Sequence, residues 1–411
     1  MIGGGPSGLA VATTLAEKGY DVCIIERNEE LGGLLDQCIH DGFGTKLYNK
    51  VLSGPEFTEK FIEKLNNLKI EKYLDSFVKT VEIHGSEKKI LTITPRGIKT
   101  ITAKSIVYAI GCRERNHYEI KIGGTRPSGI FTAGYVQRLI NLYGILPGKN
   151  VIIVGGGDVG MIVARHLYLE GVKNILMVYP EKFFIGLSRN VQQCIIDFNI
   201  PFKTQTIVKR IMGKEKIKAI EIVNVDNKWN PITGTEKILQ CDCLILSVGL
   251  IPYAEKLEEI EVKINNKTHG PEINECFETS IDGIFAIGNL VQIFDYVDDA
   301  VETAFIAAKG VEQYLKNQKT KLKPLLFKPG KNIQCFTPQR INKVLDEITI
   351  FFRSNITLNK AQILFKNSKD EIIHKINKPF IRPSTLEQIK LPLNLIKNEE
   401  EVVIDVQGKN M

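Results

Sequence analysis

The chain has 411 residues, of which 43% are hydrophobic and 25% are charged, and its formal net charge is +7. This composition excludes large-scale disorder, and the length predicts two or three domains. Basic and acidic residues are interspersed, no apolar run approaches the roughly 20 residues of a membrane span, and the cysteines form no CxxC pair. We therefore expect a cytoplasmic protein with no nucleic-acid patch, no transmembrane segment and no metal site.

A glycine turn opens the chain and leads into an expected helix and a short apolar strand at residues 22–25. Gly3, Gly5 and Gly8 have the spacing G-x-G-x-x-G, which places the pyrophosphate of a dinucleotide at a helix N-terminus. Glu26 follows the strand, where a carboxylate can accept hydrogen bonds from both ribose hydroxyls. The predicted binding residues of this first site are Gly3, Gly5, Pro6, Ser7, Gly8, Glu26, Arg27, Gly32 and Gly33.

Residues 76–103 alternate apolar and polar side chains, which predicts an antiparallel meander. The meander returns into an apolar strand that stops at Gly111. Residues 205–246 have the same alternation and return into a strand that stops at Gly249. This internal repetition predicts two copies of one kind of domain.

The second copy begins with an apolar strand at residues 151–154, a glycine turn and a helix. The predicted binding residues of this second dinucleotide site are Gly155, Gly157, Asp158, Val159, Gly160 and Gly249. The ribose position is less clear, because the next strand ends in Val178-Tyr179-Pro180-Glu181 and the nearest acid lies beyond a proline. The choice between NAD and NADP stays open.

A third signal is the strand at residues 283–287, which ends in Gly288-Asn289. The amide of Asn289 can lie beside a sugar-like chain. A helix is expected from about Val301 to Leu315, introduced by Asp298 and Asp299. Its N-terminal dipole could stabilise negative charge on a reduced flavin.

Beyond residue 321 the pattern changes to short strands, expected at residues 348–353, 361–366, 371–375 and 402–406. Pro379, Pro383 and Pro392 are expected between these strands. We interpret residues 325–411 as a small all-β module, in the form of a sandwich, without a catalytic constellation.

Four longer strings carry a resemblance to a known family: residues 32–44, 111–115, 129–134 and 247–252. With these strings, the order of motifs resembles the pyridine nucleotide-disulfide reductase superfamily. Within it, the chain is similar to a subgroup that accompanies anaerobic glycerol-3-phosphate dehydrogenases, and to FAD/NAD-binding subunits of opine and sarcosine oxidases. The resemblance covers nearly the whole chain, including the β-rich tail.

The resemblance implies an α/β fold with two Rossmann-like, three-layer dinucleotide-binding domains, one inserted in the other, followed by the all-β module. FAD would be bound by residues 1–120 and 255–318, and NAD(P)H by the inserted residues 121–254. Gly111, Gly288, Asn289 and Thr303 would join the FAD site. The resemblance also implies that several apolar residues normally precede Ile2, so we expect the first sheet to lack most of its middle strand and, if the chain is truncated, to bind FAD weakly.

The cysteine pattern departs from the disulfide reductases. Glutathione reductase-type enzymes carry two cysteines just after the second Gly-Gly, whereas this chain has only Cys38 there, in a different frame. Thioredoxin reductases carry a CxxC after the stretch that corresponds to residues 129–131, and this chain has none there. A dithiol relay is therefore not expected. Cys38 and His40 are candidate catalytic residues beside the flavin, with simple packing around the cofactor as the alternative.

The function predicted from these patterns is hydride transfer between NAD(P)H and FAD, with electrons passed to or from a second partner. The partner would be a small molecule or a protein, and a dehydrogenase subunit is one candidate. Three alternatives stay open: a thiol-dependent NAD(P)H oxidase or peroxidase that uses Cys38, an electron-transfer subunit that works only in complex with a dehydrogenase, and a non-enzymatic flavoprotein scaffold.

Overall fold

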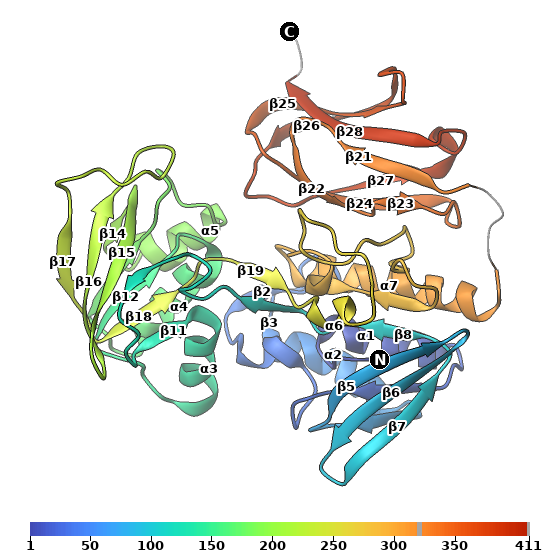
Figure 1. The fold of residues 1–411 in the computed structure, drawn as a ribbon, viewed down its shortest axis with the longest axis horizontal. Helices are drawn as coiled ribbons and strands as arrows, with labels where there is room; N and C mark the ends of the chain where they lie inside the picture. The colour runs from blue at the N-terminus through green and yellow to red at the C-terminus, as the bar shows by residue number, and fades with distance from the viewer. Residues whose placement is uncertain (319–322, 409–411) are drawn as a thin grey trace. The chain divides into compact units, whose positions relative to one another are not determined.

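The computed structural model describes residues 1–318 and 323–408, and its contacts divide the chain into two compact units (Figure 1). Unit 1 comprises Met1–Asp36, Asp41–Cys112 and Ile251–Met411, and unit 2 comprises Gln37–His40 and Arg113–Leu250. The second unit is thus inserted in the first. Residues 409–411 of the expected module lie outside the described residues. Within the described part, no helix is both long and apolar enough to cross a membrane.

The nucleotide-binding part of unit 1 mixes short parallel strands with three longer helices. Before the insertion its elements are α1 (Pro6–Glu17), β1 (Val22–Ile25), η1 (Gly33–Gln37), β2 (Asp41–Phe43), β3 (Leu52–Ser53), α2 (Gly54–Asn66), β4 (Ile70–Tyr73), β5 (Phe77–His84), β6 (Glu87–Thr94), β7 (Gly97–Ala103) and β8 (Ile106–Tyr108). After the insertion they are α6 (Glu255–Glu258), β20 (Ile284–Ala286), η3 (Gly288–Leu290) and α7 (Val297–Leu315). The expected meander is confirmed, because β5, β6 and β7 form an antiparallel sheet.

The middle of this domain's sheet is formed by Met1 and Ile2. β1 pairs in parallel with β4, and β8 pairs in parallel with β20. Ile2 connects the two pairs through parallel bridges to Ile25 on one side and Tyr108 on the other. The amino group of Met1 donates to the Cys23 carbonyl at 2.8 Å, and burial lowers the pKa of this amino group.

Unit 2 is built around a parallel sheet, and it also contains a second, mixed sheet. The elements of unit 2 are β10 (Gly123–Gly124), β11 (Ile130–Thr132), α3 (Ala133–Tyr143), β12 (Asn150–Val154), α4 (Asp158–Leu169), β13 (Asn174–Val178), α5 (Ser188–Asn190), the π-helix η2 (Val191–Ile196), β14 (Phe202–Lys203), β15 (Thr206–Gly213), β16 (Ile217–Asn224), β17 (Lys237–Gln240) and β18 (Cys243–Leu246). The short strands β9 (Cys112–Glu114) and β19 (Leu250–Pro252) each contain residues of both units. The order β11-β18-β12-β13-β14 is parallel throughout. In the second sheet, with the order β10-β15-β16-β17, the strands β15, β16 and β17 pair antiparallel, as the alternation predicts.

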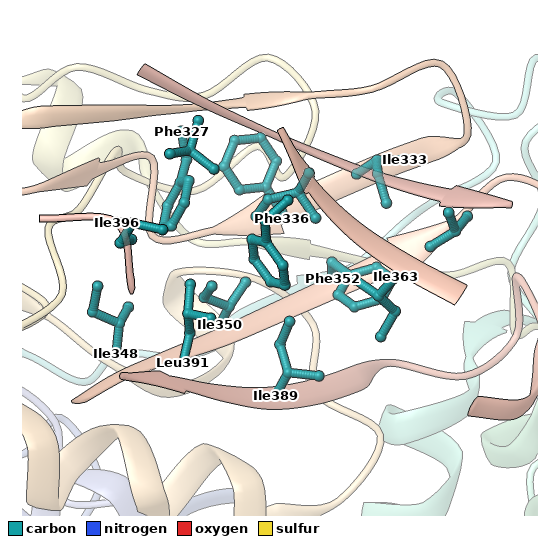
Figure 2. Close-up of a cluster of buried hydrophobic side chains, with 14 of the residues drawn as sticks. Phe327, Ile333, Phe336, Ile348, Ile350, Phe352, Ile363, Ile389, Leu391 and Ile396 are labelled. Carbon is teal, nitrogen blue, oxygen red and sulfur yellow. The ribbon is translucent and has the colours of Figure 1, made fainter. Parts of the chain in front are cut away.

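The C-terminal module consists of two packed sheets, coloured orange to red in Figure 1. Its elements are β21 (Leu325–Pro329), β22 (Ile333–Thr337), β23 (Arg340–Ile341), β24 (Glu347–Ser354), β25 (Leu358–Lys366), β26 (Ile372–Ile381), β27 (Glu387–Pro392), η4 (Leu393–Leu395) and β28 (Glu401–Gly408). The sheet orders are β23-β21-β28-β25-β26 and β22-β24-β27. Phenylalanine and isoleucine side chains fill the space between the sheets, as Figure 2 shows.

Two expectations about prolines in the module were wrong. Pro379 lies within β26 and not between strands, and Pro392 is the last residue of β27. β26 is an edge strand whose described partner is β25. An edge strand has backbone N–H groups that need no ladder partner, so it tolerates a proline.

Candidate nucleotide-binding sites

Gly3 and Gly8, the first and third glycines of the first turn, are required because other backbone atoms lie very close to them. Gly3 has φ +101°, and a Cβ there would lie 2.5 Å from the carbonyl oxygen of Ala109. A Cβ at Gly8 would lie 2.1 Å from the carbonyl oxygen of Gly3. These two glycines therefore allow α1 to pack directly against the strand ends.

Gly5, between them, is different. It is the N-cap of α1 with φ −75° and ψ −177°, which any residue can adopt. A Cβ at Gly5 would meet no atom within 4 Å among the described residues other than its neighbours. A pyrophosphate that approaches Gly5 and the N-terminal N–H groups of α1 would fill this space, so the turn fits a dinucleotide. Pro6 occupies the first helical turn, where its missing N–H costs nothing.

Glu26 lies at the end of β1 with 6% of its surface exposed. One carboxylate oxygen accepts the Gly4 N–H at 2.6 Å, and the other accepts the Asn28 N–H at 2.9 Å. These bonds fix the carboxylate beside the glycine turn, and each oxygen keeps a lone pair for a ribose hydroxyl. Arg27, which the sequence also placed in the site, is exposed.

The second Gly-Gly pair contacts the first turn. Gly33 has φ +67°, and a Cβ there would lie 2.9 Å from the Cα of Gly5. A Cβ at Gly32 would overlap the carboxylate of Asp36. Burial, followed by the nearby Glu30 and Glu26 charges, raises the pKa of Asp36 to about 6.

Gly288 and Thr303 meet at the start of α7, beside Ser7 of α1. The Thr303 hydroxyl accepts the Gly288 N–H at 2.9 Å and donates to the Ala300 carbonyl at 2.6 Å. Ser7 also donates to the Ala300 carbonyl, at 3.0 Å. The two helices that carry the first and third signals are thus joined through these groups. Asn289 accepts the Phe294 N–H at 3.0 Å, and Gly111, after β8, has φ +71°.

The expected start of α7 at Val301 was wrong, because the helix begins at Val297. Asp298 and Asp299 therefore lie within its first turn. Asp298 accepts backbone N–H groups of residues 44, 46 and 47, and Lys46 pairs with Asp299 at 2.6 Å. These contacts attach the segment after β2 to the helix N-terminus.

The second glycine turn repeats the geometry of the first. Gly155 has φ +119°, and a Cβ there would lie 2.0 Å from the Ser247 carbonyl oxygen. A Cβ at Gly160 would lie 3.0 Å from the Ser247 side chain. Gly157 is the N-cap of α4 with φ −90° and ψ 173°, and among the described residues nothing beyond its neighbours lies within 4 Å of a Cβ built there. The space beside Gly157 therefore also fits a pyrophosphate.

A loop at residues 181–190 folds back onto this second turn, which the sequence did not predict. Ile185 N–H donates to the Gly156 carbonyl at 3.2 Å. Asp158 accepts the Leu187 N–H at 2.8 Å and the Asn190 side-chain amide at 2.7 Å. Asp158 thus holds the loop, and Val159 beside it is half-buried.

Tyr179 occupies the position where a ribose carboxylate would end the second strand. Its ring is fully buried, a Cβ at Gly156 would lie 3.0 Å from it, and its hydroxyl has no hydrogen-bond partner among the described residues. Burial raises the pKa of Glu181 two positions later. Gly249, which has φ +100°, accepts the Arg115 N–H at 3.0 Å.

Cys38 and His40 lie in the short segment that belongs to unit 2. Cys38 is 7% exposed, and its Sγ lies 3.8 Å from Oε1 of Gln137 on α3. The ring of His40 lies 6.2 Å from that of His166 on α4. Burial, followed by the charges of His40 and Arg165, lowers the pKa of His166 to about 4. A role of Cys38 or His40 beside a flavin stays a prediction.

The chain is similar to a known protein family over most of its length. The family model of the pyridine nucleotide-disulphide oxidoreductases matches residues 1–308. Thioredoxin reductase of Bacillus subtilis strain 168 is 25% identical over 330 residues, which cover 79% of this chain and 96% of that protein. The small chain of NADPH glutamate synthase of Escherichia coli strain K12 is 24% identical and covers 77% of this chain and 68% of its own length.

Solved structures show the same fold. The crystal structure of T. acidophilum thioredoxin reductase superposes with a TM-score of 0.63 at 22% identity, covering 77% of this chain and 97% of that one. The Lactococcus lactis thioredoxin reductase has the same TM-score at 23% identity, covering 77% and 98%. The family model ends at residue 308, before the C-terminal module.

Proposed function

Because the chain belongs to the pyridine nucleotide-disulphide oxidoreductase family, and is an FAD-dependent NAD(P)H oxidoreductase, we propose that unit 1 holds the FAD and unit 2 the NAD(P)H. The reaction is hydride transfer between the two cofactors, followed by electron transfer to or from a partner. Family membership disfavours the non-enzymatic scaffold.

The observation that carries this assignment is the pair of matched glycine turns. In each turn the first and third glycines cannot accept a Cβ without a close contact, whereas the middle one can. A middle glycine that the protein itself does not need is explained by a ligand that approaches its Cα. Two such positions, Gly5 and Gly157, support one dinucleotide in each unit.

The cofactors, when bound, supply the redox chemistry, namely the exchange of a hydride between nicotinamide and flavin. The side chains bind and orient. Glu26 accepts the ribose hydroxyls in the first site, and the N-terminal N–H groups of α1 and α4 stabilise the pyrophosphates. The side-chain amide of Asn289 would form hydrogen bonds with the sugar-like chain of FAD.

The electron partner is proposed to be a protein subunit or a small molecule, and not a dithiol carried on this chain. The sequence has no CxxC and only Cys38 after the second Gly-Gly. Two relatives are named as parts of larger enzymes: the glutamate synthase small chain, and the hydrogen cyanide synthase subunit HcnB of Pseudomonas protegens, 23% identical over 66% of this chain. These names support a protein subunit as the partner.

The experiment that tests the assignment exchanges the two open glycines for alanine. Gly5→Ala should lose FAD, measured as the flavin-to-protein ratio after gel filtration. Gly157→Ala should keep FAD but lose anaerobic bleaching of the flavin by NADH and by NADPH. Each variant is the control for the other.

Neither substitution should change the stability of the protein without cofactor by more than about 1 kcal/mol, because both backbones suit alanine and the stiffer unfolded chain offsets the weaker N-cap. If Gly5→Ala retains FAD at the parental ratio, the first site is misassigned. If Gly157→Ala is bleached at the parental rate, the second site is misassigned.

A further inference from the structure

The loop at residues 289–296 comprises the last two residues of η3, beginning with Asn289, and the connection to α7. It is closed internally by the Phe294 N–H, which donates to the Asn289 side chain. Within it, Gln292 is 2% exposed, and neither its side-chain oxygen nor its nitrogen has a hydrogen-bond partner among the described residues. A buried amide with both groups unpaired costs several kcal/mol unless a ligand or water satisfies it. The loop therefore has the properties of a ligand-facing segment.

The C-terminal module holds this loop through one face of β24. Phe351 packs edge-on against Phe294, with 5.0 Å between the ring centroids. Arg353, two residues further on the same face, donates to the Ile293 carbonyl at 3.3 Å and pairs with Asp295. The alternate residues Ile350 and Phe352 point into the module's own core (Figure 2). β24 thus uses one face for the sandwich and the other for the loop.

The same part of the module also contacts α7 itself. Gln388 and Lys390, on the neighbouring strand β27, reach Glu302 at 2.5 and 3.4 Å. The second oxygen of Asp295 accepts the Leu386 N–H at 2.6 Å. Loop and helix are therefore held at several points along their length.

A further anchor lies before the loop. The buried carboxylate of Glu275 accepts the N–H groups of Asn342 and Val344, both at 2.8 Å. Ile273 donates to the Gln339 side chain at 3.0 Å. With this many polar contacts, the module is fixed to the first unit's nucleotide-binding part and is not a loosely tethered appendage.

We propose that the C-terminal module is a built part of the FAD site, and that Arg353 is a positioning residue that holds the loop at residues 289–296 in its FAD-binding conformation. The inference rests on the proposed function, because it needs FAD to lie beside Asn289. It assigns a role to a segment that lies beyond the family model, which ends at residue 308. Arg353 acts through Ile293 and Asp295, both of which belong to the loop.

The test compares Arg353→Gln and Arg353→Lys with the control Arg382→Gln. Arg382 is an exposed arginine of the same module, and its guanidinium carbon lies 5.2 Å from the centre of the Phe380 ring. FAD affinity is measured by flavin fluorescence on reconstituted protein, and backbone hydrogen exchange is measured for residues 289–299. Arg353→Gln should weaken FAD binding about tenfold, as expected when a charged hydrogen-bonding group is removed, and should speed exchange in that segment. Arg353→Lys should restore part of both, and Arg382→Gln should change neither.

Three results are decisive. An Arg353→Gln protein that binds FAD like the parent, with unchanged exchange, overturns the positioning role. If it fails to fold, Asp295→Asn is used instead, because it removes the arginine's carboxylate partner and leaves the module's sequence intact; parental affinity in that variant overturns the role equally. A parent protein that binds no FAD refutes the proposed function itself and not the positioning role alone.

Discussion

Glu26 provides the sharpest test of the first site, because it is both a buried structural acceptor and a proposed ligand of FAD. Glu26→Gln keeps the volume but removes the charge, and one side-chain oxygen becomes an N–H₂ group that faces a backbone N–H donor. The Gly4 and Asn28 N–H groups cannot then both be accepted as before. Each buried donor left unpaired costs about 1–3 kcal/mol, so we expect the cofactor-free protein to lose about 2 kcal/mol of stability.

The effect of Glu26→Gln on FAD affinity can be calculated separately. A ribose hydroxyl that donates to a carboxylate contributes about 1.5–3 kcal/mol, so its loss weakens FAD binding by roughly 10- to 150-fold. The two effects separate experimentally: urea unfolding of cofactor-free protein gives the first, and fluorescence titration with FAD gives the second. Glu29→Gln is the matched control, since Glu29 is an exposed carboxylate three residues further along the same segment.

Two outcomes would refute the reasoning in different ways. A stability loss without a change in FAD affinity would leave Glu26 as a structural cap of the glycine turn and remove it from the ribose site. No change in either quantity would mean that the carboxylate does not make the hydrogen bonds on which the first site is built.

Three further predictions follow from burial. The folded pKa of Asp36 is raised to about 6, so ionisation of this carboxyl group lowers the stability of the protein as the pH rises from about 4 to 6. Urea unfolding should therefore show that Asp36→Asn is about 1 kcal/mol more stable than the parent at pH 7.5, a value discounted for the partial exposure of Asp36, and equally stable near pH 4. The folded pKa of His166 is lowered to about 4, so stability should fall by about 2 kcal/mol as the pH falls from 7 to 4.5, and His166→Gln should abolish that slope. Cys38 is buried against Gln137, so Cys38→Ser should keep FAD and give an unchanged pH profile of turnover; a changed profile would support the thiol-dependent alternative.

The parts that the sequence predicted well are those with local causes. The spacing of Gly3, Gly5 and Gly8 predicts a turn in which backbone atoms come close together, and the structure has this turn and the helix α1 there. The antiparallel meanders were likewise predicted, because side-chain alternation is a property of each strand alone. Glu26 could be located by its distance from the turn, although the backbone donors that hold it could not.

The missed features depend on contacts between distant residues. The start of α7 was placed too late, because Asp298 was assigned to a helix entrance, whereas its carboxylate accepts N–H groups from a loop some 250 residues earlier. No periodic or spaced pattern in the sequence indicated the buried ring of Tyr179, the loop at residues 181–190 or the Arg353–Asp295 pair. A single aromatic or a single arginine in a sequence does not indicate what it contacts.

The insertion of unit 2 has a consequence for the order in which the chain can fold during synthesis. β8 needs β20 as its parallel partner, and residues 109–283 separate them in the chain. At about 5–20 residues per second, this stretch takes on the order of 10–30 s to translate. During that interval β8 waits on the ribosome with one edge unpaired, while most of unit 2 has already emerged and can fold. Cellular factors that protect nascent strands would therefore act on the first domain, and slowing translation within unit 2 should lower the yield of the whole protein.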